Sequence, residues 1–432
     1  MEDFKIKGIS INNIGVFENF NLEFKPKKNE DKAEIHIITG ENGSGKSTLL
    51  MLLAGMLNPL QSNPTLISRF RFKDEKSNYK ILFFNNEHIK YYNNNGNLLN
   101  DSMPYYLQKY FQYVNYSPNV EPIDFVTFAY SGYRKVEGST INGINEIRNS
   151  PFENILSFSN SVNPQLLLQW IANMKAYEAL AFMKHDREKS VKYKTTLKTI
   201  EKAISEIIDK NVRFDLGENP FSVSMIIDEQ SLTFDNLPDG LKSVISWIAD
   251  LLMRMDRIKW KDDLGVFDRS FILFLDEIEV HLHPAWQRKV LPIIQKLFKN
   301  AQIFISTHSP FVVGSVDDAW IYKLKFDGKK SEISEEILLS QDGNSVLTIL
   351  NEVFGIESMY GIEIEKKFKD FYSLRTEIIR NKENQKLILE FVDLAHYLSD
   401  QSDEIKNIIS MEVRQLKNHF GINLEFKNEA VN

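Results

Sequence analysis

Residues 40 to 48 of the chain read Gly-Glu-Asn-Gly-Ser-Gly-Lys-Ser-Thr. Glycines at this spacing before a Lys-Ser pair are typical of a phosphate-binding loop, because small residues let backbone N–H groups close around phosphate oxygens. Residues 34–39 are mostly apolar and β-branched, which predicts a buried strand before the loop. The apolar residues after Thr48 predict a helix whose positive end faces the phosphates. Strand, loop and helix together predict a nucleotide-binding α/β fold.

The side chains of this loop have separate predicted roles. Lys46 is expected to reach the outer phosphates, and the Ser47 hydroxyl is expected to hold Mg²⁺. A glycine-rich turn that arose by chance is the alternative, and the complete match between a strand and a helix disfavours it. The predicted nucleotide-binding residues of the loop are Asn42, Gly43, Ser44, Gly45, Lys46, Ser47 and Thr48.

A second segment ends in two carboxylates. Residues 271–275 are apolar throughout and Asp276 and Glu277 follow them, which predicts a parallel strand buried on both faces. Ligands bind at the carboxyl ends of such strands. Asp276 is expected to hold Mg²⁺, and Glu277 is expected to orient the attacking water or accept its proton. A charged loop after a strand is common on its own, but its pairing with the phosphate-binding loop favours the catalytic interpretation.

A third segment, residues 302–310, predicts another buried strand that ends at His308, with Ser309-Pro310 as a helix start. We expect the catalytic His308 to contact the γ-phosphate and the attacking water. A fourth segment, Asn236–Ser243, predicts a tight turn before a helix over Val244–Met255, and a helix N-terminus binds anions readily. Its predicted phosphate-contacting residues are Asp239, Gly240, Lys242 and Ser243.

Composition excludes several classes of protein. The 432 residues contain no cysteine, so disulfides and thiolate chemistry are excluded, and a reducing, cytoplasmic location is expected. No run of 18 apolar residues and no signal peptide is present, so no membrane association is expected. The net charge is −7, which argues against a surface built throughout for nucleic acid. The basic stretch Lys184–Lys202 is interrupted by acidic residues, which favours an ordinary helix surface over a DNA-binding face.

Together the four segments resemble the ABC-type ATPases, in the branch that contains the SMC, RecF and OLD proteins. The resemblance covers about residues 1–60 and 216–325. The run from Asp276 to Pro284 is similar to the Asp-Glu-Pro-Glu-x-x-Leu-His-Pro run of OLD-like proteins, with Ile278 in place of proline. The resemblance implies ATP and Mg²⁺ as cofactors.

The resemblance also implies a head-to-tail dimer or an oligomer of dimers, in which the turn at Asp239–Ser243 closes over ATP bound to another copy. Glu279 to His283 would then lie at the interface between copies. A metal site made by His281 and His283 is an alternative, because their i,i+2 spacing could bring both rings to an ion in an extended loop.

Two positions depart from the family pattern. Pro238 stands where the signature of the family has the serine that contacts phosphate, and no glutamine corresponds to the one that supports hydrolysis. Arg134, in the segment Phe128–Arg134, is the candidate that the sequence offers in place of this glutamine. Both departures predict slow turnover more than a loss of ATP binding.

The predicted fold class is α/β: an ABC-type P-loop ATPase core, with a mixed sheet and flanking helices, a helical arm insertion and a helical C-terminal extension. The apolar stripe at Leu197, Ile200 and Ile204 indicates the arm. Alternating apolar and polar residues predict an antiparallel strand pair within the first 25 residues and a second strand pair at 221–227 and 231–234, and residues 321–337 predict a hairpin that turns at Asp327-Gly328. The predicted parts are the first part of the core at 1–60, an irregular α/β insertion at 61–162, the arm at 163–215, the second part of the core at 216–340 and the helical C-terminal region at 341–432.

No Asp-x-Asp follows Pro310, so the metal ligands of a TOPRIM nuclease are missing there. A core of this branch with an arm, a helical tail and no nuclease resembles the stand-alone ATPase subunits of anti-phage systems, of the PtuA and AriA types. The resemblance implies a sensor or scaffold that holds a separate effector such as a nuclease. A RecF-like or SMC-like repair ATPase that clamps DNA is the alternative. A transporter subunit is disfavoured by the missing glutamine and the Leu-His-Pro run.

Overall fold

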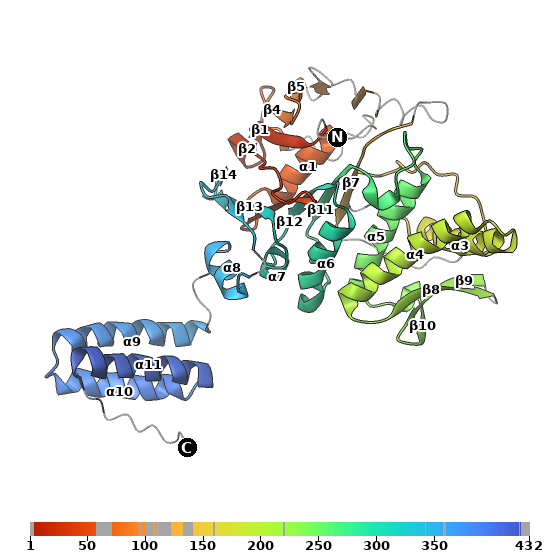
Figure 1. Ribbon diagram of the computed structural model, residues 1–432. Coiled ribbons are helices and arrows are strands. Elements are labelled where there is room, and N and C mark those ends of the chain that lie inside the picture. Colours follow the sequence, from red (N-terminus) through yellow and green to blue (C-terminus); the bar gives the residue numbers. More distant parts are fainter. Residues whose placement is uncertain are drawn as a thin grey trace. The chain divides into compact units, whose positions relative to one another are not determined.

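The computed structural model describes residues 4–57, 71–94, 97–100, 107–108, 110, 122–132, 141–158, 160–218, 221–341, 343–356, 360–422 and 424. The chain divides into two compact units, Met1–Phe354 and Gly355–Asn432. Each is described by itself below (Figure 1). Within the described residues, no helix combines the length and the apolar character that a membrane crossing requires.

The first unit is built on a mixed sheet in the order β14-β13-β3-β12-β11-β7, with β15 paired to β13. The strands β7, β11, β12, β3 and β13 run parallel to their neighbours, whereas β14 and β15 pair antiparallel to β13. This arrangement confirms the predicted α/β class. The strands are β3 (Glu34–Gly40), β7 (Val126–Ser131), β11 (Phe271–Asp276), β12 (Gln302–Ser306), β13 (Ala319–Phe326), β14 (Ser331–Ile333) and β15 (Leu338–Leu339).

Every residue of β7, β11 and β12 is buried, which explains why the apolar residues of β11 and of the middle of β12 are consecutive and do not alternate with polar ones. The predicted hairpin over residues 321–337 is confirmed, because β13 and β14 pair antiparallel through Phe326 and Ser331.

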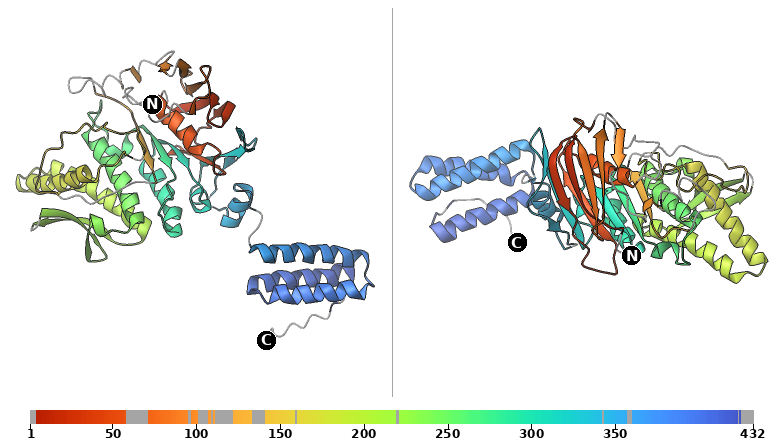
Figure 2. Two further views of the ribbon diagram at one scale, coloured as in Figure 1. Left: turned by 180° about the vertical axis from the view of Figure 1, so that it is seen from behind. Right: turned by 90° about the horizontal axis from the view of Figure 1, so that it is seen from above.

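An antiparallel sheet with the order β2-β1-β4-β5-β6 covers the other side of α1 (Lys46–Met56), which contacts β4 and also β3, β11 and β12 (Figures 1 and 2). The predicted antiparallel pair near the N-terminus is confirmed as β1 and β2. These strands are β1 (Ile6–Ile14), β2 (Phe17–Glu23), β4 (Asn78–Phe83), β5 (His88–Asn94) and β6 (Asn97–Asn100).

The segment predicted as an insertion at 61–162 belongs structurally to the core. Its strand β4 extends the sheet of β1, and β7 pairs in parallel with β11. The sequence could not reveal this, because pairing between strands that are distant along the chain leaves no local pattern in one sequence.

The predicted arm contains two antiparallel helices, α3 (Pro164–Met183) and α4 (Arg187–Ile208), packed against a three-stranded sheet (Figure 2). Leu197, Ile200 and Ile204 are buried as predicted. The sheet contains β8 (Val212–Glu218), β9 (Phe221–Ile227) and β10 (Gln230–Thr233), and only β9 and β10 were predicted. Three basic residues of the stretch Lys184–Lys202 form ion pairs, Lys189 with Asp186, Lys194 with Glu178 and Lys202 with Glu206, which supports the ordinary helix surface.

Among its described residues, the first unit also contains α5 (Asp239–Arg257), α6 (Pro284–Leu297), α7 (Pro310–Val313) and α8 (Val346–Glu352). The second unit consists of α9 (Ile362–Arg380), α10 (Gln385–Ser399) and α11 (Asp403–Phe420), which enclose their own core around Phe371, Phe391 and Leu398. The predicted C-terminal region began at residue 341. In the structure Ile349 and Val353 belong to the core of the first unit, so the second unit begins at Gly355.

Candidate nucleotide-binding site

The phosphate-binding loop connects β3 to α1 and needs its glycines. Gly43 and Gly45 have φ of 83° and 95°, in the left-handed region that side chains disfavour. A Cβ on Gly45 would lie 2.7 Å from the Phe17 ring, and one on Gly40 would lie 2.4 Å from the Leu324 carbonyl oxygen. Lys46 Nζ donates to the carbonyl oxygens of Gly40 and Glu41 at 3.0 and 2.9 Å, so its ammonium lies across the mouth of the loop.

Ser47 and Asp276 meet although 229 residues separate them. Ser47 Oγ donates to Asp276 Oδ1 at 3.0 Å, and Ser306 Oγ also donates to that oxygen. A hydroxyl and a carboxylate are the oxygen ligands that suit Mg²⁺, which commonly takes one or two protein ligands and completes its shell with phosphate and water. The residues present therefore fit the predicted ion.

Glu277 follows Asp276 in a left-handed conformation, with φ of 51°. Its N–H donates to the Ser306 carbonyl and hydroxyl oxygens at 3.1 Å, which fixes the turn at the end of β11. Burial raises the pKa of the Glu277 carboxyl and the charge of Asp276 raises it further, while Lys46 opposes both. The raised pKa makes this carboxylate a better proton acceptor than an ordinary glutamate.

His308 follows β12, the strand between β3 and β11. Burial lowers the pKa of its imidazole, and the Lys46 ammonium lowers it further, while Asp276 opposes them. The ring is therefore neutral at pH 7 and can donate one hydrogen bond and accept one. The structure thus brings Lys46, Ser47, Asp276, Glu277 and His308 to the carboxyl ends of β3, β11 and β12, where parallel sheets bind ligands.

The predicted turn at Asp239–Ser243 is the first turn of α5, which begins earlier than predicted and has Pro238 as its N-cap. The sequence suggested a turn because Pro238 and Gly240 flank Asp239, but proline is well tolerated at a helix start. The Asp239 side chain is 81% exposed and lies 3.8 Å from Lys242 Nζ. Among the described residues, the carboxylates whose charge acts on Lys46 are Asp276, Glu277 and Glu279. The structure does not bring Asp239 to the loop of its own chain.

His283 has a structural role. Its Nδ1 accepts a hydrogen bond from the Ala285 N–H at 3.2 Å and caps α6, so that nitrogen is engaged. No cluster of three or more histidine or acidic residues able to hold a metal ion occurs in the part of the chain that the structure describes. A metal site at His281 and His283 stays a prediction from the sequence. Arg134 lies outside the described residues.

Two residues near the site were not predicted for it. Arg71 Nη1 donates to Thr48 Oγ1 at 2.9 Å, and burial lowers the pKa of this guanidinium while Asp276 raises it. No motif surrounds Arg71, so the sequence carried no signal for it. Glu279 accepts a hydrogen bond from the backbone N–H of His308 at 2.6 Å, although the sequence had suggested an interface between copies for this residue.

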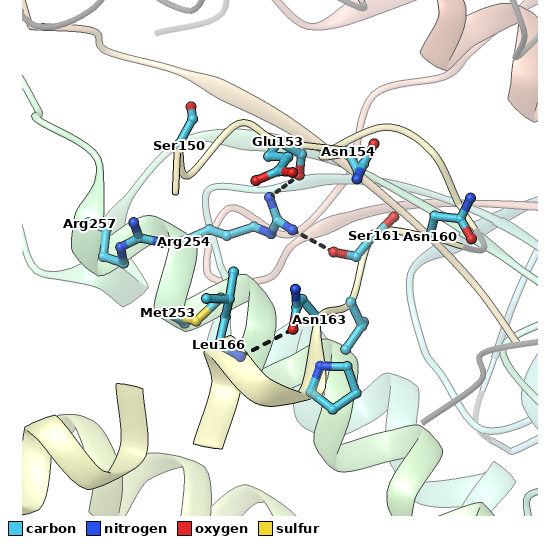
Figure 3. A pocket seen from close by; sticks show the side chains of 12 residues that line it. Ser150, Glu153, Asn154, Asn160, Ser161, Asn163, Leu166, Met253, Arg254 and Arg257 are labelled. Atoms are coloured by element: carbon cyan, nitrogen blue, oxygen red, sulfur yellow. Dashed lines mark hydrogen bonds between the residues drawn. The ribbon is translucent and has the colours of Figure 1, made fainter. Parts of the chain in front are cut away.

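A cavity of about 290 Å³ lies elsewhere, between α5 and the loop of residues 150–163 (Figure 3). Arg254 lies in its wall and donates to the carbonyl oxygens of Pro151, Glu153 and Ser161 and to Asp250 Oδ2, at 2.5 to 2.8 Å. These bonds use four of the five N–H donors of the guanidinium. Arg254 therefore ties the loop to α5 and is not offered to a ligand.

The chain is similar to several known proteins. The family model described as "AAA domain, putative AbiEii toxin, Type IV TA system" matches residues 35–314. The Septu protein PtuA of Bacillus thuringiensis is 23% identical over 95% of this chain and 98% of its own length. The Retron Ec83 probable ATPase of Escherichia coli is 33% identical, but the match covers 31% of this chain and only 24% of that protein. The SMC head domain from Thermotoga maritima aligns with a TM-score of 0.41 at 13% identity, over 78% of this chain and all of that one.

Proposed function

Because the chain belongs to the family described as AAA domain, putative AbiEii toxin, Type IV TA system, we propose that it is a magnesium-dependent ATPase that works as one subunit of an anti-phage defence system in the cytoplasm. One observation carries the proposal: a lysine, a hydroxyl, two carboxylates and a neutral histidine from three distant segments meet at one edge of the sheet. Phosphoryl transfer to water needs little more than positioning and charge at that place.

Each residue has a proposed role in binding. The loop from Asn42 to Thr48 would hold the phosphates of ATP, with Lys46 turning from its own carbonyls to the outer phosphates. Ser47 and Asp276 would hold Mg²⁺, which when bound neutralises charge that develops on the phosphates. Arg71, held beside Thr48, would add a second positive charge to that side of the site.

The proposed chemistry uses Glu277 and His308. Glu277 would orient the attacking water and accept its proton, which its raised pKa favours. His308 would donate a hydrogen bond to the γ-phosphate, and its lowered pKa keeps the ring neutral so that a nitrogen remains free to accept.

We further propose that two copies of the chain complete two sites in a head-to-tail dimer or an oligomer of dimers. The first turn of α5 would close over ATP on the second copy, through Asp239, Gly240, Lys242 and Ser243. The exposed side chain of Asp239 supports this role, because it faces solvent at the N-terminal, positive end of a 19-residue helix, whereas Gly240 and Ser243 are buried within their own chain.

The proposed partner beyond the second copy is a separate effector protein such as a nuclease. Similarity over almost the whole chain to a protein named Septu protein PtuA supports this assignment, as does the local similarity to retron ATPases. ATP would hold the assembly closed, and its hydrolysis would release it.

Hydrolysis assays and mass measurements on the purified protein test the proposal. We expect Mg²⁺-dependent ATP hydrolysis, its loss with nucleotide binding in Lys46→Ala, and retention of bound ATP in Glu277→Gln with a doubled particle mass. Wild-type protein that fails to bind ATP, or a Glu277→Gln variant that stays a monomer in saturating ATP, would refute the site or the dimer, respectively. A chelator of Mg²⁺ serves as the control. It should stop hydrolysis by the wild type and should not change the two variants, which hydrolyse no ATP to begin with.

A further inference from the structure

The loop between β11 and α6, residues Glu277–His283, is called the connector loop here. Two tight turns shape it, in which the Val280 N–H donates to the Glu277 carbonyl oxygen at 3.1 Å and the Leu282 N–H to that of Glu279 at 2.9 Å. Ile278 and Leu282 are buried and anchor it to the core. The loop therefore has a fixed shape, and a displacement at one end is passed to the other.

Two glycines from other segments press against the connector loop. A Cβ on Gly132, just after β7, would lie 2.0 Å from the Glu277 carbonyl oxygen and 2.7 Å from Val280 Cβ. A Cβ on Gly240, in the first turn of α5, would lie 2.4 Å from the His281 carbonyl oxygen. The backbone of α5 and the backbone of the connector loop are thus in direct contact, with no side chain between them.

Glu279 links the same loop to the histidine of the nucleotide site. Its Oε1 accepts a hydrogen bond from the backbone N–H of His308 at 2.6 Å, and the Thr307 side chain also donates to the carboxylate. Its Oε2 is buried and has no hydrogen-bond partner among the described residues. The Glu279 side chain therefore points toward Thr307 and His308 of its own chain. Since an alanine there would orphan a buried backbone donor, the bond matters for where His308 lies.

A second connection joins the segment after β12 to α6 without Glu279. Ser309 Oγ donates to Gln287 Oε1 at 2.5 Å, and Gln287 Nε2 donates to the Leu282 carbonyl oxygen at 2.9 Å. Because this connection stays in place, a change at Glu279 alters the position of His308 without freeing the whole segment.

We propose that Glu279 is a positioning residue, which holds His308 at the γ-phosphate position and couples it through the connector loop to Gly240 and the first turn of α5. The inference rests on the proposed function, in which His308 contacts the γ-phosphate. A shift of His308 on phosphate binding or release is transmitted by Glu279 to His281 and from there to the turn that meets the second copy. Removal of the hydrogen bond between Glu279 and His308 uncouples His308 from the first turn of α5.

A pair of matched variants separates the reach of the side chain from its charge. Glu279→Gln keeps an oxygen at the position that accepts the His308 N–H, whereas Glu279→Asp keeps the charge and is one methylene too short. We expect kcat of Glu279→Asp to fall about 10- to 100-fold with KM for ATP changed less than about 2-fold, because a small misplacement of a catalytic group costs that much. We expect Glu279→Gln to retain kcat within about 3-fold.

A double-mutant cycle tests whether the effect passes through His308. On a His308→Ala background, Glu279→Asp should lower kcat less than about 2-fold further, because the residue then has no ring to position. The coupling to α5 is measured as the ATP-dependent gain in particle mass, which Glu279→Asp should reduce and Glu279→Gln should not.

Three outcomes would overturn the positioning role. Glu279→Gln and Glu279→Asp could lower kcat equally, or Glu279→Asp could retain kcat while Glu279→Gln loses it. The third outcome is that the losses of kcat caused by Glu279→Asp and His308→Ala are additive. Thermal unfolding of each variant confirms that it is folded, and if Glu279→Asp fails to fold, Glu279→Ser takes its place in the cycle. Failure of the proposed function looks different, since the wild type itself would then hydrolyse no more ATP than Lys46→Ala.

Discussion

At the scale of single residues, Glu277 and His308 have pKa shifts of opposite sign within one site. Burial and Asp276 raise the pKa of Glu277 above its ordinary 4.5, whereas burial and Lys46 lower the pKa of His308 below its ordinary 6.5. The two groups therefore approach each other on the pH scale, and both are in their proposed working form near neutral pH, with Glu277 ionised and His308 neutral.

The pH profile of hydrolysis follows from these directions. Because Glu277 must lose its proton before it can accept one, kcat/KM should fall as the pH drops through the raised pKa, at a pH above 4.5. His308 loses its neutral form over a range below 6.5, which steepens the same limb. Initial rates between about pH 4 and pH 9 measure the profile, with circular dichroism to verify folding. A rate that stays constant down to pH 4.5 in folded protein would contradict the assignment.

The sequence predicted those site residues that stand in a contiguous motif. Lys46 and Ser47 are fixed by the glycine spacing around them, and Asp276 and Glu277 by the apolar strand before them. Arg71 could not be predicted, because its bond to Thr48 depends on how the chain returns from α1 to β4. Glu279 stood in a predicted run, but the direction of its side chain is set by the neighbouring strand β12.

At the scale of elements, a buried ion pair within α5 ties this helix to β7 and to the loop of residues 150–161. Arg254 Nε donates to Asp250 Oδ2 at 2.6 Å, and the Tyr130 hydroxyl on β7 donates to the same oxygen at 2.9 Å. The three carbonyls that Arg254 also binds come from the loop of residues 150–161 (Figure 3). The Arg254–Asp250 pair thus fixes a helix, a strand and a loop relative to one another.

Arg254→Met should lower the free energy of unfolding of the first unit by about 3 to 5 kcal/mol, because it leaves the buried Asp250 without its cation. Tyr130→Phe is the matched control. It removes a single hydrogen bond and should cost about 1 kcal/mol. Thermal unfolding of both variants measures the difference, and an Arg254→Met protein as stable as Tyr130→Phe would show that the loop does not need the arginine.

The sequence predicted helices and strands that show a local pattern of apolar residues. It missed strands that are recognised only by their hydrogen bonds to a partner strand. The stripe at Leu197 and Ile200 predicted α4, and the apolar run before Asp276 predicted β11. β7 is equally buried, yet it was assigned to an insertion because its partner β11 lies more than 100 residues away. β8 was assigned to the arm for the same reason, since only its register with β9 identifies it as a sheet strand.

At the scale of the whole molecule, the site and the second unit are independent in construction. Every residue assigned to the nucleotide site lies within Met1–Phe354, and the second unit has its own apolar core. A chain that ends at Phe354 should therefore hydrolyse ATP within about 3-fold of the full-length rate, since no site residue is removed. Steady-state assays on both proteins compare them. A loss as large as that of Lys46→Ala would mean that the second unit contributes to the site.

The head-to-tail arrangement makes a further prediction that no single variant can test. Lys46→Ala removes nucleotide binding, and Lys242→Glu places a repelling charge in the first turn of α5, so each protein alone should be inactive. In a mixed dimer, the intact loop of one copy faces the intact turn of the other and one of the two sites is complete.

An equal mixture of the two variants should therefore recover about a quarter of the wild-type rate, because random pairing makes about half of the dimers mixed and each has one working site. The rate of the mixture is compared with those of the separate variants at the same total concentration, and a mixture of Lys46→Ala with Glu277→Gln is the control. Those two changes spoil both sites of a mixed dimer, since each copy carries a defect in its own loop or carboxylate. Recovery in the control, or none in the test mixture, would refute a site shared between two copies.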